Sequence, residues 1–538
     1  MKNILKDHYL KTPEELLETI KNWFSDNKKL ALIITLIIGF ITHIVLISTT
    51  ILSPDGLWNA MHYSAGVVET TSGRWAINLI DSLRKDVAIP VITTTISILV
   101  TGIISVFVVD FFEIKSKISV VIISAFFAVS PCLALTLLYS YTADAYTYAF
   151  LFSVLAVWFI YREKHEIFNY ILASIFIMLT LAIYQSFLGA IIVLCIMKPV
   201  LDILRNKKTY KEVFKKIGIS ILIVVIGIAL YWFSEKIALN IYDVELSSYK
   251  GASDIGVENT IKNLNVTVIK AYKFFLKFFL RDDVILNSNI SRTTFYKILG
   301  ITMIVVLGII LIYRKAESKK NKIIDTALIL FGISLIPLAT NIITIIAPET
   351  IFYPLNETQI FLVIPFAMAI LEEYKFKRGI ILKYIALIMF LIIGVTYYLS
   401  DNISYFIVKL KYNQTYAITV RMVDRIENTE GYSKDKPWAI VGILDEKNSE
   451  QVTDLYFLTY GGFVNGPIFH GNYGGSTENW RRFLQMFMGI QPNMVSQEEY
   501  NRICETEEFK KMSIFPNPDS VKEIDGIMVV KYTNEIPQ

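Results

Sequence analysis

Long apolar stretches alternate with short polar ones along most of the chain, and this pattern predicts membrane-spanning helices. Apolar runs of roughly 17–24 residues recur, which is the length that a helix needs to cross the hydrocarbon core of a bilayer. About eleven such spans are expected, at residues 30–52, 88–109, 118–138, 145–161, 168–183, 187–204, 217–233, 296–313, 323–346, 360–371 and 381–399. The sequence therefore predicts an α-helical polytopic membrane protein.

Lysine and arginine residues gather in every second loop between these spans. They precede the first span, lie between the second and third, and recur at residues 162–164, 205–216, 314–322 and 375–378. The opposing short loops near 140–144, 184–186 and 347–358 contain neither residue. Because cytoplasmic loops are enriched in these cations, we expect a cytoplasmic N-terminus. An odd number of spans then places the C-terminal segment outside a multi-pass protein of the cell (plasma or inner) membrane.

The polar segments divide the chain into three expected parts. Residues 1–29 form a cytoplasmic N-terminal segment, and residues 30–400 form a transmembrane domain with large outer loops at 53–87 and 234–295. Residues 401–538 form an extracytoplasmic C-terminal domain. In this tail, residues 438–444 and 527–532 resemble buried strands, and the glycine-rich stretch 461–475 resembles turns. A small α/β domain is therefore expected outside the membrane.

Composition narrows the class of protein further. The chain is 54% hydrophobic and 19% charged, and its mean hydropathy is +0.49; soluble proteins carry more charge. The net charge of +4 belongs to scattered loop lysines, so nucleic acid is not an expected partner, whereas the lipid bilayer is. The sequence contains no phosphate-binding Gly-x-x-x-x-Gly-Lys-Ser/Thr loop, no Asp-x-Asp and no histidine–cysteine cluster. ATP-driven transport and a metal site are therefore not expected.

Two short polar stretches place carboxylates at the outer ends of apolar helices. The first, residues 53–59, contains Asp55, and the second, residues 139–146, contains Asp144 among tyrosines. A carboxylate at a membrane boundary is costly unless something uses it. Asp55 has the chemistry of a general base that takes the proton of a sugar hydroxyl. The alternative is a plain turn, since Pro-Asp-Gly is a turn sequence.

The loop after Asp55 supplies further candidates for substrate binding, namely Glu69, Arg74 and Trp75. Arg74 can clamp a phosphate by paired hydrogen bonds, or it can form an ion pair with Glu69 or Asp81. Trp75 can stack on a sugar ring, or it can belong to the aromatic belt of the membrane interface.

Residues of the later loops also have two possible roles, one in substrate binding and one in the local structure. Tyr141 and Asp144 can contact substrate, and Asp144 can also cap the next helix. Tyr184 and Gln185 can form a tight turn between two spans, or they can line a cavity that a glycan reaches.

Taken in order, these motifs resemble the GtrII-type glucosyltransferases, polytopic enzymes of the GT-C superfamily, over about residues 30–400. The resemblance implies an inverting, metal-independent enzyme without a cofactor. It moves a sugar, commonly glucose, from a polyprenyl-phosphate carrier to a cell-envelope glycan. By position, Asp55 matches the catalytic base. Many GT-C enzymes show two adjacent acids there, whereas Gly56 follows Asp55 here, so Glu69 and Asp144 stay open as alternatives.

Two other classes of function stay open on the sequence. A flippase or transporter of lipid-linked sugars would need polar residues near mid-membrane, and most spans carry no charge at that depth. A non-catalytic partner of an envelope glycosylation complex is the third class. For the enzyme, a donor synthase and a flippase are the expected protein partners. The tail is expected to shape acceptor choice, with aromatic residues between 456 and 480 stacking on a glycan.

Overall fold

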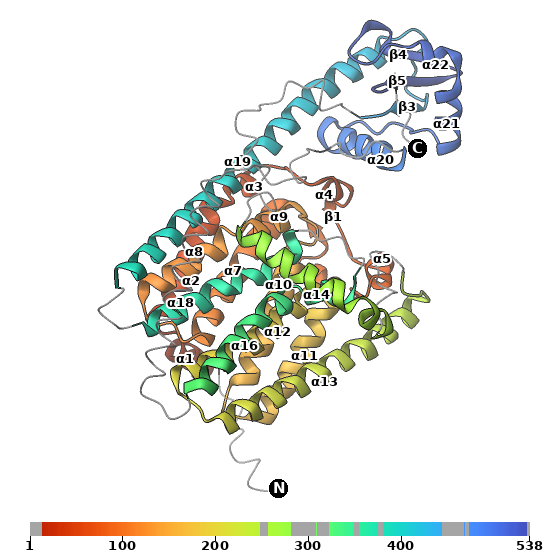
Figure 1. Ribbon diagram of the computed structural model, residues 1–538. Helices are drawn as coiled ribbons and strands as arrows, with labels where there is room; N and C mark the ends of the chain where they lie inside the picture. The colour runs from red at the N-terminus through yellow and green to blue at the C-terminus, as the bar shows by residue number, and fades with distance from the viewer. Residues whose placement is uncertain are drawn as a thin grey trace.

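The computed structural model of the protein describes residues 13–247, 257–280, 308, 322–348, 354–374, 380–443, 467 and 473–534. A helical bundle carries a small α/β domain at one end, and the first described helix, α1 (Pro13–Trp23), lies toward the other end (Figure 1). The predicted span at 296–313 lies outside the described residues apart from residue 308.

Nine helical segments of the described part are long and apolar enough to cross a membrane. They match nine of the predicted spans. They are α7 (Pro90–Phe111), α8 with α9 (Lys117–Ala128, Pro131–Leu138), α10 (Ala143–Tyr161), α11 (Glu166–Ile183), η1 with α12 (Gln185–Phe187, Leu188–Arg205), α13 (Tyr210–Tyr242), α16 (Lys322–Thr340), η4 with α18 (Pro354–Leu362, Val363–Glu373) and α19 (Ile380–Glu427). The helical polytopic architecture is confirmed.

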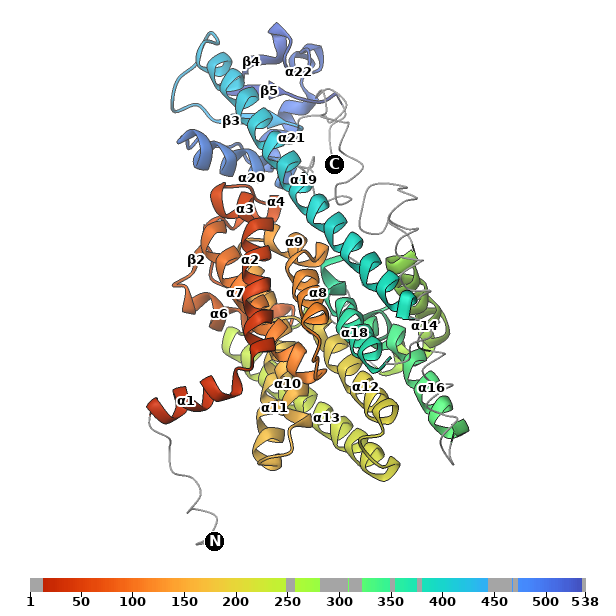
Figure 2. The same cartoon turned by 90° about the vertical axis from the view of Figure 1, so that its left-hand side faces the viewer.

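The first predicted span is also helical, but it is broken. It consists of α2 (Asp26–Thr42) and α3 (Ile44–Ser48), which meet at His43. The buried His43 ring bonds to the Tyr405 hydroxyl and to the Ala128 carbonyl, at 2.9 Å each. A second break separates α8 from α9, where Pro131 lacks the N–H that would continue α8. The amphipathic helix α1 (Pro13–Trp23) precedes α2 and points away from the bundle (Figure 2).

The expected outer loop at 53–87 folds into several short elements. These are α4 (Pro54–Trp58), α5 (Val67–Thr71), α6 (Ile77–Leu83) and the antiparallel strands β1 (Met61–His62) and β2 (Val87–Ala88). In the expected loop at 234–295, α13 continues to Tyr242 and α14 covers Val257–Leu280. The short helix α17 (Ile342–Ile346) packs on α14.

The C-terminal α/β domain contains a three-stranded sheet in the order β3-β5-β4. Strands β3 (Trp438–Val441) and β5 (Ile527–Lys531) correspond to the two predicted buried strands, and they run parallel to each other. Strand β4 (Val521–Ile524) is antiparallel to β5. The helical elements are α20 (Tyr473–Phe483), the π-helical turn η6 (Leu484–Met488), α21 (Gln497–Glu505), α22 (Glu507–Lys511) and η7 (Pro518–Ser520). Gly474 and Gly475, expected in turns, lie in the first turn of α20 instead.

A single long helix, α19, connects the bundle to this domain. It has 48 residues and crosses the expected domain boundary at residue 400 without a break. Its last turns place Met422 and Ile426 in the hydrophobic core of the α/β domain, together with Trp438 and Trp480. The domain is therefore fixed to the bundle by a continuous helix.

Candidate functional site

Asp55 lies in the first turn of α4, at the end of the bundle that faces the α/β domain (Figure 1). The helix begins because the Ser53 hydroxyl caps it, accepting a hydrogen bond of 3.0 Å from the Gly56 N–H, and because Pro54 suits the first helical position. The Asp55 side chain is half-buried, and within the described residues it forms neither a hydrogen bond nor an ion pair. Such a carboxylate is available to accept a proton.

Two tyrosines lie between the neighbourhoods of Asp55 and Glu69, and one of them, Tyr63, contacts Glu69. The Tyr63 hydroxyl donates a hydrogen bond to Glu69, whose other oxygen accepts one of 2.9 Å from the Gly66 N–H. The Tyr63 and Tyr141 rings meet edge to face, 4.7 Å apart. Burial raises the pKa of the Tyr141 hydroxyl well above its usual value, and nearby Tyr146 and Asp55 raise that pKa further. Burial and the hydrogen bond to Glu69 likewise raise the pKa of the Tyr63 hydroxyl, so both phenols stay protonated at neutral pH.

Arg74 lies beside two stacked aromatic rings. Its Nη1 is 3.3 Å from the Tyr146 hydroxyl, and its Cζ is 5.1 Å from the centre of the Tyr184 ring. The Tyr146 and Tyr184 rings stack at 4.3 Å, and the Tyr184 hydroxyl donates to Asn356. The aromatic faces favour a cation at this place. The contacts described for Arg74 are thus to aromatic residues, whereas the expected alternative was an ion pair with Glu69 or Asp81.

The turn that carries Arg74 is held by α13 and by Gln185. Gly73 adopts a φ of +73°, which favours glycine. The Tyr231 hydroxyl lies 3.1 Å from the Gly73 carbonyl oxygen and 2.6 Å from Glu235 Oε1. Gln185 Nε2 donates to the Ser72 carbonyl at 2.9 Å. Tyr231 and Glu235 are functional candidates that the sequence reasoning missed, although their spacing of four places them on one helix face.

Asp144 belongs to a buried ion cluster. Arg84 Nε donates to Asp144 at 3.0 Å, and Arg84 Nη2 donates to Asp81 at 2.5 Å and to the Tyr141 carbonyl at 2.6 Å. Asp81 also accepts a hydrogen bond from the Ala65 N–H. Burial raises the pKa of Asp81 to about 7, although this hydrogen bond and Arg84 act against the shift. Arg84 was missed; its spacing of three from Asp81 on a short helix is the signal that was available.

The remaining predicted residues have structural contacts. Tyr184 and Gln185 lie at the turn between α11 and α12, where Ser186 donates to the Asn356 carbonyl at 3.2 Å. The Trp75 side chain is half-buried, and its indole nitrogen has no hydrogen-bond partner in the described part of the chain. The expected tight turn is thus present, and both Tyr184 and Gln185 also contact the Arg74 turn.

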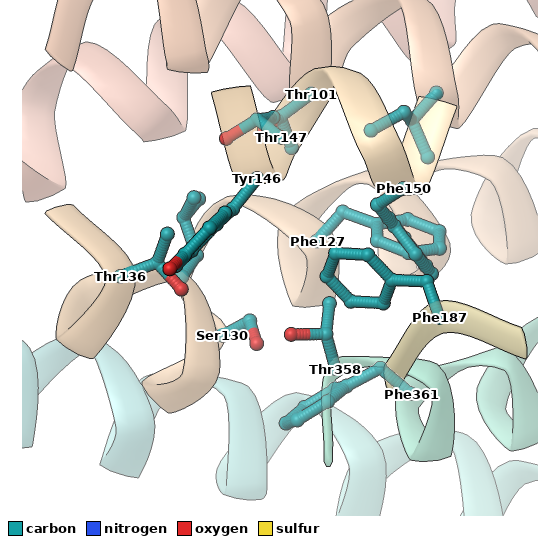
Figure 3. Close-up of a pocket in the computed structure, with 12 residues that line it drawn as sticks. Thr101, Phe127, Ser130, Thr136, Tyr146, Thr147, Phe150, Phe187, Thr358 and Phe361 are labelled. Carbon is teal, nitrogen blue, oxygen red and sulfur yellow. The ribbon is translucent and has the colours of Figure 1, made fainter. Parts of the chain in front are cut away.

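A small cavity lies next to this cluster, and Tyr146 belongs to both. Figure 3 shows that hydroxyl groups and phenyl rings both line the cavity. The hydroxyls include Ser130, Thr136, Tyr146 and Thr358, and the rings include Phe127, Phe150 and Phe187. Such a lining suits a ligand with both apolar and polar parts. Over the described ranges, no group of three or more His, Cys, Asp or Glu side chains is arranged to hold a metal ion.

Comparison with known protein families adds one decisive observation. The family model described as Glucosyl transferase GtrII matches residues 52–372, which is more than half of the chain. The chain belongs to the GtrII glucosyltransferase family. No curated protein and no solved structure gives a significant match.

The GtrII match identifies the protein as a glycosyltransferase with multiple membrane-spanning helices. The matched residues begin one residue before Ser53, the cap of α4, and include every candidate site residue from Asp55 to Gln185. The GtrII region ends in α18, so α19 and the α/β domain lie outside it.

Proposed function

We propose that this protein transfers glucose from a polyprenyl-phosphate carrier to a cell-envelope glycan on the outer face of the cell membrane. The observation that carries the proposal is the Asp55 carboxylate, which has no partner among the described residues and lies in one polar cluster with Tyr141 and Arg74. Family membership supports the glucosyl group, and the loop charges support the outer face. A donor synthase and a flippase would deliver the carrier to this face.

In the proposed reaction, the acceptor hydroxyl attacks the anomeric carbon of the glucose. The bond between that carbon and the carrier phosphate breaks, and the phosphate oxygen keeps the electron pair. Asp55 takes the proton of the hydroxyl, and attack from the face opposite the phosphate inverts the anomeric configuration. General-base help of this kind contributes roughly 10²–10⁴-fold to the rate.

Arg74 is the proposed ligand of the carrier phosphate. The leaving phosphate carries negative charge, so it needs a fixed cation rather than a proton. In this proposal Arg74 supplies that charge without a metal ion. Because Tyr146 contacts Arg74 and also lines the small cavity, the proposal places the first isoprene unit of the carrier beside the Tyr146 ring while the phosphate stays at Arg74.

The test uses purified protein, polyprenyl-phosphate glucose and the envelope glycan, and it measures released carrier phosphate together with glucose on the glycan. The wild type is expected to form both, and Asp55→Asn is expected to lower the rate by roughly 10²–10⁴-fold while the protein keeps its melting temperature. Glu163→Gln, at an exposed acid between α10 and α11, is the matched control.

Three outcomes contradict parts of the proposal. A wild-type rate in Asp55→Asn moves the base to Glu69 or Asp144. Transbilayer movement of the lipid-linked sugar without release of the carrier phosphate identifies a flippase. Neither movement nor release, in folded protein, identifies a non-catalytic partner.

A further inference from the structure

The helix that carries Asp55 is too short to hold its own position. It has five residues, and an isolated helix of that length is unstable in water. The Asp55 carboxylate itself is not tied by any described side chain. The place of the carboxylate therefore depends on what holds the two ends of α4.

The first end of α4 is held by the bundle and by α19. The Ser53 N–H donates to the Leu138 carbonyl at 3.0 Å. The buried Tyr412 of α19 donates its hydroxyl to the Leu52 carbonyl at 3.1 Å. Both contacts fix backbone groups that precede Asp55 in the chain.

The second end of α4 is held by the C-terminal domain. The indole N–H of Trp58 donates a hydrogen bond to the side-chain oxygen of Asn479 on α20. Asn479 is fully buried. Helices α20 and α4 lie against each other, as both views of the fold show (Figures 1 and 2).

Asn479 is itself fixed by the core of the domain. The next residue, Trp480, is fully buried, stacks on Tyr532 at 5.2 Å and donates to the Gly442 carbonyl at 3.2 Å. Trp480 is therefore a core residue, and the expectation that it stacks on a glycan is wrong. Two further residues of this segment, Phe483 and Phe487, pack on Tyr412, whose hydroxyl bonds to the Leu52 carbonyl.

We infer that the C-terminal domain completes the active site, because Asn479 holds Trp58 and with it the position of α4 from which Asp55 acts. This inference rests on the proposed function of Asp55 and goes beyond the expected role of the tail in acceptor choice. Asn479 and Trp58 are positioning residues. Trp58 follows Asp55 by three residues, so a shift of this end of α4 moves the carboxylate directly. A misplacement of about 1 Å costs up to roughly a hundredfold in rate.

The test is a double-mutant cycle of Trp58→Phe and Asn479→Leu in the full-length protein. Trp58→Phe keeps an aromatic ring and removes the donor, and Asn479→Leu keeps the volume and removes the acceptor. Each single variant is expected to lower kcat roughly ten- to a hundredfold with little change in the KM for polyprenyl-phosphate glucose. The double variant is expected to be no slower than the slower single variant. Arg482→Gln, on the same helix and bonded only to Glu478 within the described residues, is the control with wild-type kcat.

Wild-type kcat in both single variants overturns the inference, and so do losses that multiply in the double variant. If Asn479→Leu lowers the melting temperature, Trp58→Phe decides alone, since Trp58 lies outside the domain. Asp55→Asn in the same assay separates the two proposals. An inactive Asp55→Asn with fully active Trp58→Phe and Asn479→Leu overturns only the positioning role. Wild-type protein without transfer overturns the proposed function itself.

Discussion

The three carboxylates considered for the base differ in what surrounds each of them. Asp144 is buried and bonded to Arg84, so its negative charge is balanced by the Arg84 guanidinium. Glu69 is half-buried and accepts hydrogen bonds from Tyr63 and from the Gly66 N–H. Asp55 alone among these three has no such partner. General-base catalysis needs a carboxylate that can reach a substrate hydroxyl, and Asp55 meets this condition best.

Arg74→Lys tests the proposed phosphate ligand. Lysine keeps the positive charge but loses the planar fork that binds two phosphate oxygens and lies flat on an aromatic ring. The KM for the lipid-linked donor is expected to rise roughly tenfold, as for the loss of one charged hydrogen bond of about 1.5 kcal/mol, while the KM for the acceptor glycan changes little. Steady-state kinetics with each substrate varied in turn give both values. Equal effects on the two substrates, or no effect, would count against this role.

The raised pKa of Asp81 gives the protein a pH-dependent stability. Because burial raises this pKa to about 7, the folded state binds more protons than the unfolded state between about pH 4 and 7. The contribution of Asp81 to the free energy of unfolding therefore falls as pH rises through this range, with a slope of at most about 1.4 kcal/mol per pH unit. Above this range Asp81 causes no further change.

Asp81→Asn is expected to flatten that slope, since the amide keeps a hydrogen-bond acceptor and has no proton to lose. Melting temperatures of the wild type and the variant in detergent, measured from pH 4.5 to 8, test it. Parallel curves for the two proteins would show that Asp81 does not titrate in this range.

At the scale of elements, the sequence predicts where helices cross the membrane better than where they end. The spans were found because runs of about twenty apolar residues have few other uses. The span predicted at 217–233 extends over Tyr210–Tyr242 as α13, and the span predicted at 381–399 continues to Glu427 as α19. Hydropathy identifies only the apolar part of a helix, so it does not predict the polar turns by which a helix continues beyond that part.

The short elements of the candidate site were harder to predict for a related reason. Helix α6 contains Asp81, which pairs with Arg84, but neither residue stands out in a loop whose contacts come from other parts of the chain. Arg74 was assigned an ion pair as its alternative role, whereas its described neighbours are the aromatic rings of α10 and the α11–α12 turn. Those neighbours are set by packing between elements that lie far apart in the sequence.

Gly73→Ala tests the turn between α5 and α6. A Cβ atom at this residue would overlap the Tyr231 hydroxyl and lie 2.5 Å from Glu235 Oε1, and the φ of +73° strains any other residue. The turn would move and take Arg74 with it, so transfer is expected to fall at least tenfold, since small misplacements at an active site are costly.

Tyr231→Phe supplies the matched control for this turn, because it removes the hydroxyl that the new methyl group meets. The double variant Gly73→Ala with Tyr231→Phe is expected to recover part of the lost rate. If the double variant is slower than Gly73→Ala alone, steric overlap with Tyr231 is not the cause.

At the scale of the whole molecule, the two ends of the bundle differ in chemistry. The candidate site and the α/β domain share one end (Figure 1). Cations cluster at the other end of α10 and α12, where Lys198, Lys207 and Arg205 bond to Glu113 and Glu373. Lys198 and Lys207 lower the pKa of Glu113 to about 2, although burial acts in the opposite direction. This asymmetry agrees with the charges of the predicted cytoplasmic loops.

The orientation in the membrane is the last prediction. Lys164 lies in the exposed turn between α10 and α11, and Lys511 ends the exposed helix α22 of the α/β domain. Asp144 and Tyr161 lie near the two ends of α10, and a helix of this length spans about 28 Å. We therefore expect the Lys164 turn and the site to lie on opposite sides of the membrane. An impermeant maleimide is expected to label Lys511→Cys in intact cells and Lys164→Cys only after lysis.

The native protein, whose Cys132 and Cys504 are buried and whose Cys195 is half-buried, gives the background. Labelling of Lys164→Cys in intact cells and of Lys511→Cys only after lysis would place the site in the cytoplasm, where a carrier in the outer leaflet could not reach Arg74.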